Sequence, residues 1–202
     1  SPCMGAGHSS YASGVDIDGE TWGDPPSMGC DEVHAGAVTG AISVSAWAEY
    51  ADVAVGFVVG FCANIEGRVM ESVWNFGDGV VASNQIILTH AFDAPGHYDV
   101  ILTAFNETHP EGIAETVTVR VAEQAVHYVR ADDVMPLAPF TNWATAAAVI
   151  QEAVEAVIQP GALVLVSNGV YGTGGKIMQA GLSNRVALNL PLTLRSVNGP
   201  AE

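Results

Sequence analysis

Apolar and polar residues alternate along the middle of the chain, and this alternation predicts β-strands. In the segment 113–121, Val117, Val119 and Val121 alternate with polar residues, which gives the strand one apolar face and one polar face. The segment 98–105 has the same period of two, starting from Tyr98. Short apolar runs of this kind are separated by turn residues; they are 55–65, 69–76, 85–88, 98–105 and 113–121. Strands at such spacing predict a β-sandwich.

Beyond Gln124 the apolar residues change to a helical spacing. The stripe consists of Ala147, Ile150, Val154, Val157 and Ile158. It predicts a helix over residues 141–159, with Thr141 or Asn142 as its N-cap and Pro160-Gly161 as its end. Short strands are expected after it, at 162–166, 170–171, 185–190 and 192–196. An apolar cap helix followed by short strands is typical of the beginning of a β-solenoid.

Residues 1–35 are rich in Gly, Ser, Pro and Asp and show little alternation, so we expect turns there. Two of the three cysteines, Cys3 and Cys30, lie in this stretch, whereas Cys62 lies apart. Three cysteines are too few for a disulfide scaffold, although one bridge can form in an oxidising compartment. We favour a Cys3–Cys30 pair that leaves Cys62 free; the alternative is three unpaired thiols.

The charge balance narrows the choice of partners. The chain has Lys+Arg 6 against Asp+Glu 22, a formal net charge of -16. Nucleic acid and anionic membranes are therefore excluded as expected partners, because each phosphate contact needs a cation. Most of the acidic residues are expected to be solvated surface, with cation binding as the alternative.

No apolar run is long enough to span a membrane. Since the chain begins at Ser1 with neither Met nor a basic-then-apolar leader, we expect it to be processed or excised.

Two separated motifs in the middle of the chain resemble the signatures of PKD (polycystic kidney disease) domains. Residues 73–79 read VWNFGDG and residues 90–100 read HAFDAPGHYDV. The family signatures usually read W-D-F-G-D-G and H-x-Y/F-x-x-P-G-x-Y-x-V, so Asn75 stands in place of the usual Asp. Their order and distance make the match specific, and it covers about residues 37–123. The resemblance implies an immunoglobulin-like sandwich whose core includes Trp74, Phe76, Tyr98, Val100 and Leu102.

The motif residues are expected to have structural roles. Gly77 and Gly79 permit a tight turn after a core strand, and the Asp78 carboxylate can accept hydrogen bonds from N–H groups of that turn. Pro95-Gly96 forms the turn into the next strand. We expect His90 to hold this turn region through hydrogen bonds rather than to take part in catalysis.

The C-terminal part resembles the opening of right-handed parallel β-helix proteins, pectate-lyase-like solenoids of large secreted bacterial polypeptides. The supporting segments are HYV at 127–129, WATA at 143–146, IQEAV at 150–154, VLV at 164–166, NGVY at 168–171 and RSVNG at 195–199. The resemblance implies a cap helix followed by the first rungs of a solenoid.

The N-terminal part resembles the closing segment of the same β-helix family. Members often end with S-P-C-x-x-A-G, then D-x-D-G, then G-A-x-E. Here the corresponding segments read SPCMGAG at 1–7, DIDGE at 16–20 and MGCDE at 28–32, with Cys30-Asp31 altering the last of them.

We therefore predict an all-β chain: a PKD/immunoglobulin-like β-sandwich plus a partial parallel β-helix with an N-terminal cap helix. Its expected domains are a β-helix-closing-like segment at 1–35, the sandwich at 36–124, and the cap helix and first rungs at 125–202. An isolated β-helix start exposes unpaired backbone groups and apolar surface. The N-terminal segment of a neighbouring copy is the simplest cover, and such head-to-tail contact produces a filament.

Motifs for catalysis are absent from the sequence. The six histidines show no close metal-ligand spacing, and no nucleophile elbow, P-loop or dinucleotide fingerprint occurs. We expect no enzymatic activity and no cofactor other than calcium. The candidate calcium ligands are Asp16, Asp18 and Glu20, three carboxylates at alternate positions beside a Gly turn. The alternative is an Asp-rich turn whose carboxylates accept hydrogen bonds from its own N–H groups.

Two functions from different classes fit these observations. The first is a non-catalytic structural subunit or repeat, extracellular or on the cell surface, that assembles with other copies of itself head to tail into a filament or surface array. The second is a carbohydrate-binding or adhesion module from a secreted polysaccharide-degrading enzyme, with extracellular polysaccharide as its partner. The first is favoured because most of the four tryptophans, Trp22, Trp47, Trp74 and Trp143, lie in motif or core-like contexts, which leaves no row of exposed aromatic side chains.

Overall fold

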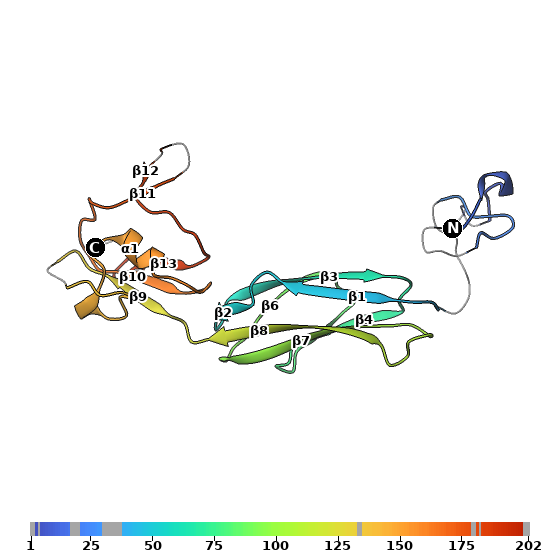
Figure 1. The fold of residues 1–202 in the computed structure, drawn as a ribbon, viewed down its shortest axis with the longest axis horizontal. Helices are drawn as coiled ribbons and strands as arrows, with labels where there is room; N and C mark the ends of the chain where they lie inside the picture. Colours follow the sequence, from blue (N-terminus) through green and yellow to red (C-terminus); the bar gives the residue numbers. More distant parts are fainter. Residues whose placement is uncertain are drawn as a thin grey trace.

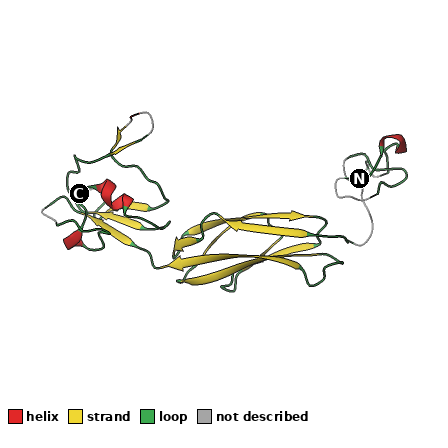
Figure 2. Cartoon of the chain, in the orientation of Figure 1, coloured by secondary structure: helices red, strands yellow, loops and turns green. Residues whose placement is uncertain are grey.

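The strands in the middle of the chain form two sheets that pack face to face (Figures 1 and 2). The computed structural model describes residues 3, 5–16, 21–29, 38–132, 135–178, 181 and 183–199. One sheet has the order β1-β3-β6, with β1 at Ser43–Ala48, β3 at Val58–Glu66 and β6 at Ile87–Ala91. The other has the order β2-β8-β7-β4-β5, and only its β2–β8 pair is parallel. Its strands are β2 (Asp52–Ala54), β4 (Glu71–Asn75), β5 (Val81–Ser83), β7 (Gly96–Phe105) and β8 (Ile113–Ala122). The predicted β-sandwich is confirmed.

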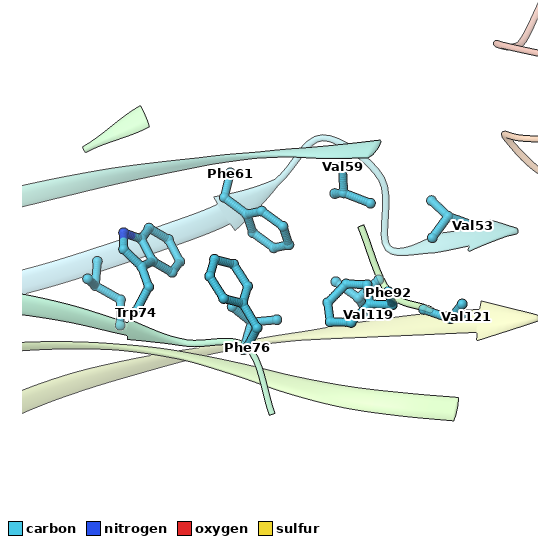
Figure 3. Packing of buried hydrophobic residues seen from close by; sticks show 10 residues of the cluster. Val53, Val59, Phe61, Trp74, Phe76, Phe92, Val119 and Val121 are labelled. Carbon is cyan, nitrogen blue, oxygen red and sulfur yellow. The ribbon is translucent and has the colours of Figure 1, made fainter. Parts of the chain in front are cut away.

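Aromatic side chains fill the space between the two sheets (Figure 3). Trp74 of β4 and Phe76, which directly follows that strand, face Phe61 of β3, with ring centroids 5.9 Å and 5.5 Å from the Phe61 ring. The indole N–H of Trp74 donates a hydrogen bond to the Gln85 carbonyl at 2.8 Å, so the buried ring has no unpaired polar atom. The predicted core is confirmed: Trp74, Phe76, Val100 and Leu102 are buried, and Tyr98 packs against them.

The turn after β4 is held by the residues expected from the motif. The Asn75 side chain accepts a hydrogen bond from the Gly77 N–H, and the Asp78 side chain accepts one from the Val80 N–H, each at 3.0 Å. The Asp78 carboxylate also lies 2.7 Å from Nε2 of His90, whose ring stacks on Phe76. Burial acts to raise the pKa of Asp78, but the hydrogen bonds from Val80 and His90 outweigh it and lower the pKa below its ordinary value. His90 therefore has the structural role expected from the sequence.

Asn106 connects three turns at one end of the sandwich. Its side-chain amide donates hydrogen bonds to the carbonyls of Gly40 and Arg68, both at 3.0 Å. Its side-chain oxygen accepts a hydrogen bond from the His109 N–H at 2.9 Å. The residue is only 2% exposed. A buried amide with this many partners holds the turns together, because removing it takes away the hydrogen bonds that link them.

The C-terminal part contains a three-stranded parallel sheet and one short α-helix. Strands β9 (Val126–Val129), β10 (Leu163–Val166) and β13 (Thr193–Ser196) pair in the order β13-β10-β9. A small hairpin of β11 (Lys176–Ile177) and β12 (Ser183–Asn184) projects beside them. Helix α1 (Ile150–Glu155) packs under the sheet through Ala153 and Val154. Among the described residues, no helix has the length and apolar content that a membrane span requires.

The predicted helix over 141–159 is wrong in its extent. Only 150–155 is α-helical, a 3-10 turn η2 occupies Trp143–Thr145, and Ile158 is 90% exposed. The cause lies between them, where Ala147 pairs with β9 in a parallel bridge and so has extended backbone. Tertiary hydrogen bonding outweighs helix propensity at this point. Asn142 is an N-cap as predicted, but of the 3-10 turn.

Two of the predicted C-terminal strands are also wrong. The strands at 162–166 and 192–196 correspond to β10 and β13, whereas 170–171 and 185–190 are not strands. Gln151 explains part of the second error: its side chain accepts a hydrogen bond from the Ala187 N–H at 2.8 Å and donates one to the Ala187 carbonyl at 3.3 Å. The Gln151 side chain thus pairs with the backbone groups of Ala187 that a neighbouring strand would otherwise bind.

The described residues of the segment 1–35 form turns, as predicted. A 3-10 turn η1 occupies Ser9–Tyr11, and Val15 and Thr21 form an isolated antiparallel bridge. Two stretches are tied by backbone hydrogen bonds, from Gly7 N–H to the Pro26 carbonyl at 2.6 Å and from Met28 N–H to the Cys3 carbonyl at 2.8 Å.

The sandwich joins the C-terminal part through direct contacts. The Ala54 N–H donates a hydrogen bond to the Pro160 carbonyl at 2.9 Å, and the Gln159 amide donates one to Asp52 at 2.7 Å. Gly161 fits against the sandwich with φ +89, and a Cβ there would lie 3.0 Å from the Cβ atoms of Ala54 and Phe57. A backbone hydrogen bond, a side-chain hydrogen bond and close packing therefore hold β2 against the residues that precede β10.

Candidate functional site

The parallel sheet of β9, β10 and β13 is built from three segments in matching register. Leu163 of β10 pairs with Val126 of β9 on one side and with Thr193 of β13 on the other. The pairing continues in step to Val166. Corresponding residues of successive strands therefore lie directly above one another.

The interior face of this sheet is closed at one end and open at the other. One interior row runs from His127 through Val164 to Leu194. His127 and Val164 are buried, but Leu194 is 39% exposed. All four residues of β13 are exposed, whereas β9 and β10 each bury alternate residues. The apolar row thus ends at the surface, where a further strand would bury it.

The outer edge of β9 is covered by the chain itself. The Tyr128 N–H donates a hydrogen bond to the Phe140 carbonyl at 2.7 Å, and Ala147 exchanges backbone hydrogen bonds with both Tyr128 and Arg130 at 2.9 Å. The His127 ring adds a 2.7 Å hydrogen bond between Nδ1 and the Pro139 carbonyl. This edge therefore has its backbone groups paired.

The outer edge of β13 is open. The N–H groups of Thr193 and Val197 donate to carbonyls of the β10 segment at 2.9 Å. Because successive residues of a strand point their backbone groups to opposite sides, those of Leu194 and Ser196 point away from β10. Within the described residues, no strand pairs with β13 on that side. An edge of this kind can accept an added strand.

Charged side chains support the segment between β10 and β13. Lys176 forms an ion pair with Glu155 of α1 at 3.0 Å. The hydrogen bond from Lys176, and then that from Gln151, lowers the pKa of Glu155 below its ordinary value. The helix therefore anchors the long connection that brings the chain back to form β13.

The candidate calcium ligands lie mostly outside the described residues. Asp16 is described and buried, whereas Asp18 and Glu20 are not described. In the part of the chain that is described, no three His, Cys, Asp or Glu residues gather as a metal site. Calcium binding at Asp16, Asp18 and Glu20 stays a prediction. If it occurs, chelation lowers the melting temperature, and an identical melt with and without chelator contradicts it.

The predicted Cys3–Cys30 pair likewise stays a prediction, because Cys30 is outside the described residues. Cys62 lies on β3 as a half-buried thiol.

The expectation about the tryptophans is wrong for two of them. Trp74 is buried, but Trp47 is 51% exposed and Trp143 is 36% exposed. Trp47 was hard to place because β1 follows a turn-rich stretch and its outward residues include serines. Trp143 was placed in a core helix that the structure does not form. The sequence signal that could have separated them is the alternation of β1, which puts Trp47 on the same face as Ser43 and Ser45.

Comparisons with known proteins support the central assignment. The family model of the PKD domain matches residues 47–121, which span most of the sandwich. No curated protein matches the chain.

Three solved structures are similar in part. One, described as the structural basis for the promiscuous specificity of carbohydrate-binding modules from the β-sandwich superfamily, is 24% identical, with a TM-score of 0.39; the match covers 44% of this chain and 37% of that one. The PKD domain of the human VPS10 domain-containing receptor SorCS2 is 22% identical over 46% of this chain and 82% of its own, with a TM-score of 0.35. The PKD1 domain of Vibrio anguillarum Epp is 20% identical over 41% and 98%, with a TM-score of 0.31.

Proposed function

We propose that this chain is a non-catalytic structural module of the cell exterior, in which a PKD sandwich carries the beginning of a parallel β-helix that a second copy continues. In this proposal the domains are the closing-like segment 1–35, the sandwich 36–124, and the cap and first rungs 125–202. The PKD match supports an extracellular or cell-surface location. The resulting contact is head to tail, which builds a filament or surface array.

One observation carries the proposal: the two edges of the C-terminal sheet differ. The β9 edge is hydrogen-bonded to residues within 139–147 of the same chain, whereas the β13 edge is open and the interior row ends at the exposed Leu194. The chain offers a donor for this edge in residues 1–35, which resemble the segment that finishes such solenoids. Burying apolar area at the joint contributes about 25 cal/mol per Å².

The sharpest test replaces Leu194 at the end of the interior row. Leu194→Asp puts a charge where the next rung must bury apolar surface, and we expect it to abolish or sharply weaken assembly. Ile177→Asp is the matched control, because Ile177 is also exposed but lies on the β11–β12 hairpin. Electron microscopy and analytical ultracentrifugation over a range of concentrations measure the assembly.

Deletion of residues 1–35 tests the donor. We expect the truncated chain to keep a folded sandwich and to lose assembly, since the core in Figure 3 contains none of the deleted residues. A full chain that stays monomeric at high concentration, or a truncated chain that assembles as well as the full one, contradicts the proposal.

A second candidate function, binding of extracellular polysaccharide, is favoured by the exposed Trp47 and Trp143. Exposed indole rings are the side chains that stack on the apolar faces of sugar rings. Co-sedimentation of the full chain with insoluble cellulose, chitin and xylan tests it, and a chain that stays in the supernatant with all three contradicts it.

A further inference from the structure

The three parallel strands end at one corner, and the residues just beyond them line a cavity of about 420 Å³. Because Val129, Val166 and Ser196 are aligned, the next two residues of each segment also follow one another across the sheet. The cavity is lined by Arg130, Asp132, Trp143, Ser167, Asn168, Val197 and Asn198. Its walls thus come from the first turn after each strand, together with the 3-10 turn η2.

Trp143 supplies a fixed aromatic surface at this cavity. Its ring meets the Tyr128 ring edge to face, with centroids 4.6 Å apart. Asn142 caps the 3-10 turn by accepting hydrogen bonds from the N–H groups of Ala144 and Thr145. Trp143 is 36% exposed, and its indole N–H makes no hydrogen bond among the described residues. A rigid ring of this kind binds a ligand face at low cost in conformational entropy.

The polar groups of the cavity have unused hydrogen-bonding capacity. The side-chain amides of Asn168 and Asn198 make no hydrogen bonds within the described part of the chain, and each offers both donors and an acceptor. Arg130 and Asp132 lie 3.7 Å apart between Nε and the carboxylate, too far for a strong hydrogen bond. One positive and one negative side chain leave the cavity without net charge.

These features select the chemistry of the ligand. An aromatic face beside amides that both donate and accept matches a sugar, whose ring has an apolar face and a rim of hydroxyls. An anionic ligand is disfavoured because Arg130 is paired with Asp132 and the chain has a net charge of -16. A wholly apolar ligand is disfavoured because it would leave the amides and charges without partners.

We propose that this cavity is a binding site for a neutral oligosaccharide, with Trp143 as its stacking residue and Asn168 and Asn198 as its hydrogen-bonding residues. The inference rests on the second candidate function and locates it in the C-terminal sheet rather than on the sandwich.

Isothermal titration calorimetry of the full chain tests the site. The probes are the neutral hexasaccharides of β-1,4-linked glucose, xylose, mannose and N-acetylglucosamine, with the anionic hexasaccharide of galacturonic acid as a comparison. Titrations are made at a concentration where ultracentrifugation gives a single species, so that a second copy does not cover the cavity. We expect at least one neutral probe to bind with one site per chain and the anionic probe to bind more weakly.

Two tryptophan variants then test whether bound sugar lies in this cavity or elsewhere on the chain. Trp143→Ala should lower the affinity roughly ten- to thirty-fold, as truncation of a central aromatic anchor does. Trp47→Ala is the matched control, because it removes the other exposed indole, and it should bind as the unchanged chain does. The double variant Asn168→Ala/Asn198→Ala, which leaves the Trp143–Tyr128 contact intact, should also weaken binding by about tenfold.

If sugars bind but only Trp47→Ala lowers the affinity for them, the proposed location of the site is wrong although the chain binds carbohydrate. If no neutral probe binds, the site and the second candidate function both fail. Tighter binding of the anionic probe, or affinity unchanged by both Trp143→Ala and the double asparagine variant, also overturns the proposal.

Discussion

The sandwich and the C-terminal sheet bury their apolar residues in opposite ways. In the sandwich, apolar side chains from both sheets meet inside the chain, and the row of aromatic rings in Figure 3 is fully enclosed. In the C-terminal part a single parallel sheet covers one helix, and its interior row runs out at Leu194 on an open edge. The sandwich therefore has a complete core, whereas the parallel sheet has a core beside β9 and β10 and, among the described residues, an unpaired edge at β13.

The largest expected effect tests the completeness of the sandwich core. Trp74→Ala removes a fully buried ring and its hydrogen bond to Gln85, so we expect it to lower the free energy of unfolding by about 3 to 5 kcal/mol. Trp47→Ala, on the outer face of the sandwich, should change it by less than about 1 kcal/mol. Urea unfolding followed by far-UV circular dichroism measures both. Equal effects of the two variants would contradict the core assignment.

A smaller effect is expected at the end of the sandwich where Asn106 ties three turns. Asn106→Ala leaves the carbonyls of Gly40 and Arg68 without that donor, and we expect a loss of about 2 to 3 kcal/mol by urea unfolding. Asn64→Ala is the control, because Asn64 is exposed and, among the described residues, its side chain makes a single long contact, to Glu66. If both substitutions have the same small effect, Asn106 does not hold this end closed.

The sequence predicted the sandwich well because its signals are local and repeated. Alternation in 117–121 and the two PKD motifs indicate which side chains point inward, and Asn75 and Asp78 bind backbone N–H groups two residues away in the turn after β4. β1 and β5 were harder because their outward faces carry the apolar residues Trp47 and Val81, which weaken the alternation that the serines of β1 still show.

The C-terminal part was harder because long-range hydrogen bonds decide its conformation. Ala147 is the first residue of the apolar stripe that predicts a helix, yet its backbone is extended because it pairs with Val129 of β9. The segment 185–190 looks like a strand by composition, yet Gln151 of α1 binds its backbone at Ala187. The cavity beside Trp143 depends on the register of strands thirty or more residues apart along the chain, and local patterns carry no information on that register.

The pH dependence of stability tests the role of the Asp78 carboxylate in the turn after β4. The pKa of Asp78 is lowered in the folded chain, so its charge stabilises the fold at neutral pH. That contribution is fully present above the ordinary pKa of 3.8 and is lost as the pH falls through the lowered value. Asp78→Asn keeps the acceptor for the Val80 N–H but removes the charge. We expect it to cost about 1 kcal/mol at pH 7 and less as the pH falls below 3.8, measured by urea unfolding. A cost that does not change with pH would assign the whole effect to the neutral hydrogen bond.

The most direct test of the difference between the two regions makes the same substitution in both, and its effect on monomer stability at Leu194 is the smallest that we expect. Leu102→Ala removes a fully buried side chain from the sandwich and should cost about 2 to 5 kcal/mol. Leu194→Ala removes the same atoms at the open edge, where 39% of the residue is exposed, and should cost less than about 1 kcal/mol in the monomer. If assembly buries Leu194, the same variant should require a higher concentration to assemble, so its effect appears in ultracentrifugation rather than in unfolding of the dilute chain. A large loss of monomer stability from Leu194→Ala would mean that the row is already closed within one chain. The open edge would then be an ordinary sheet border with no need of a second copy.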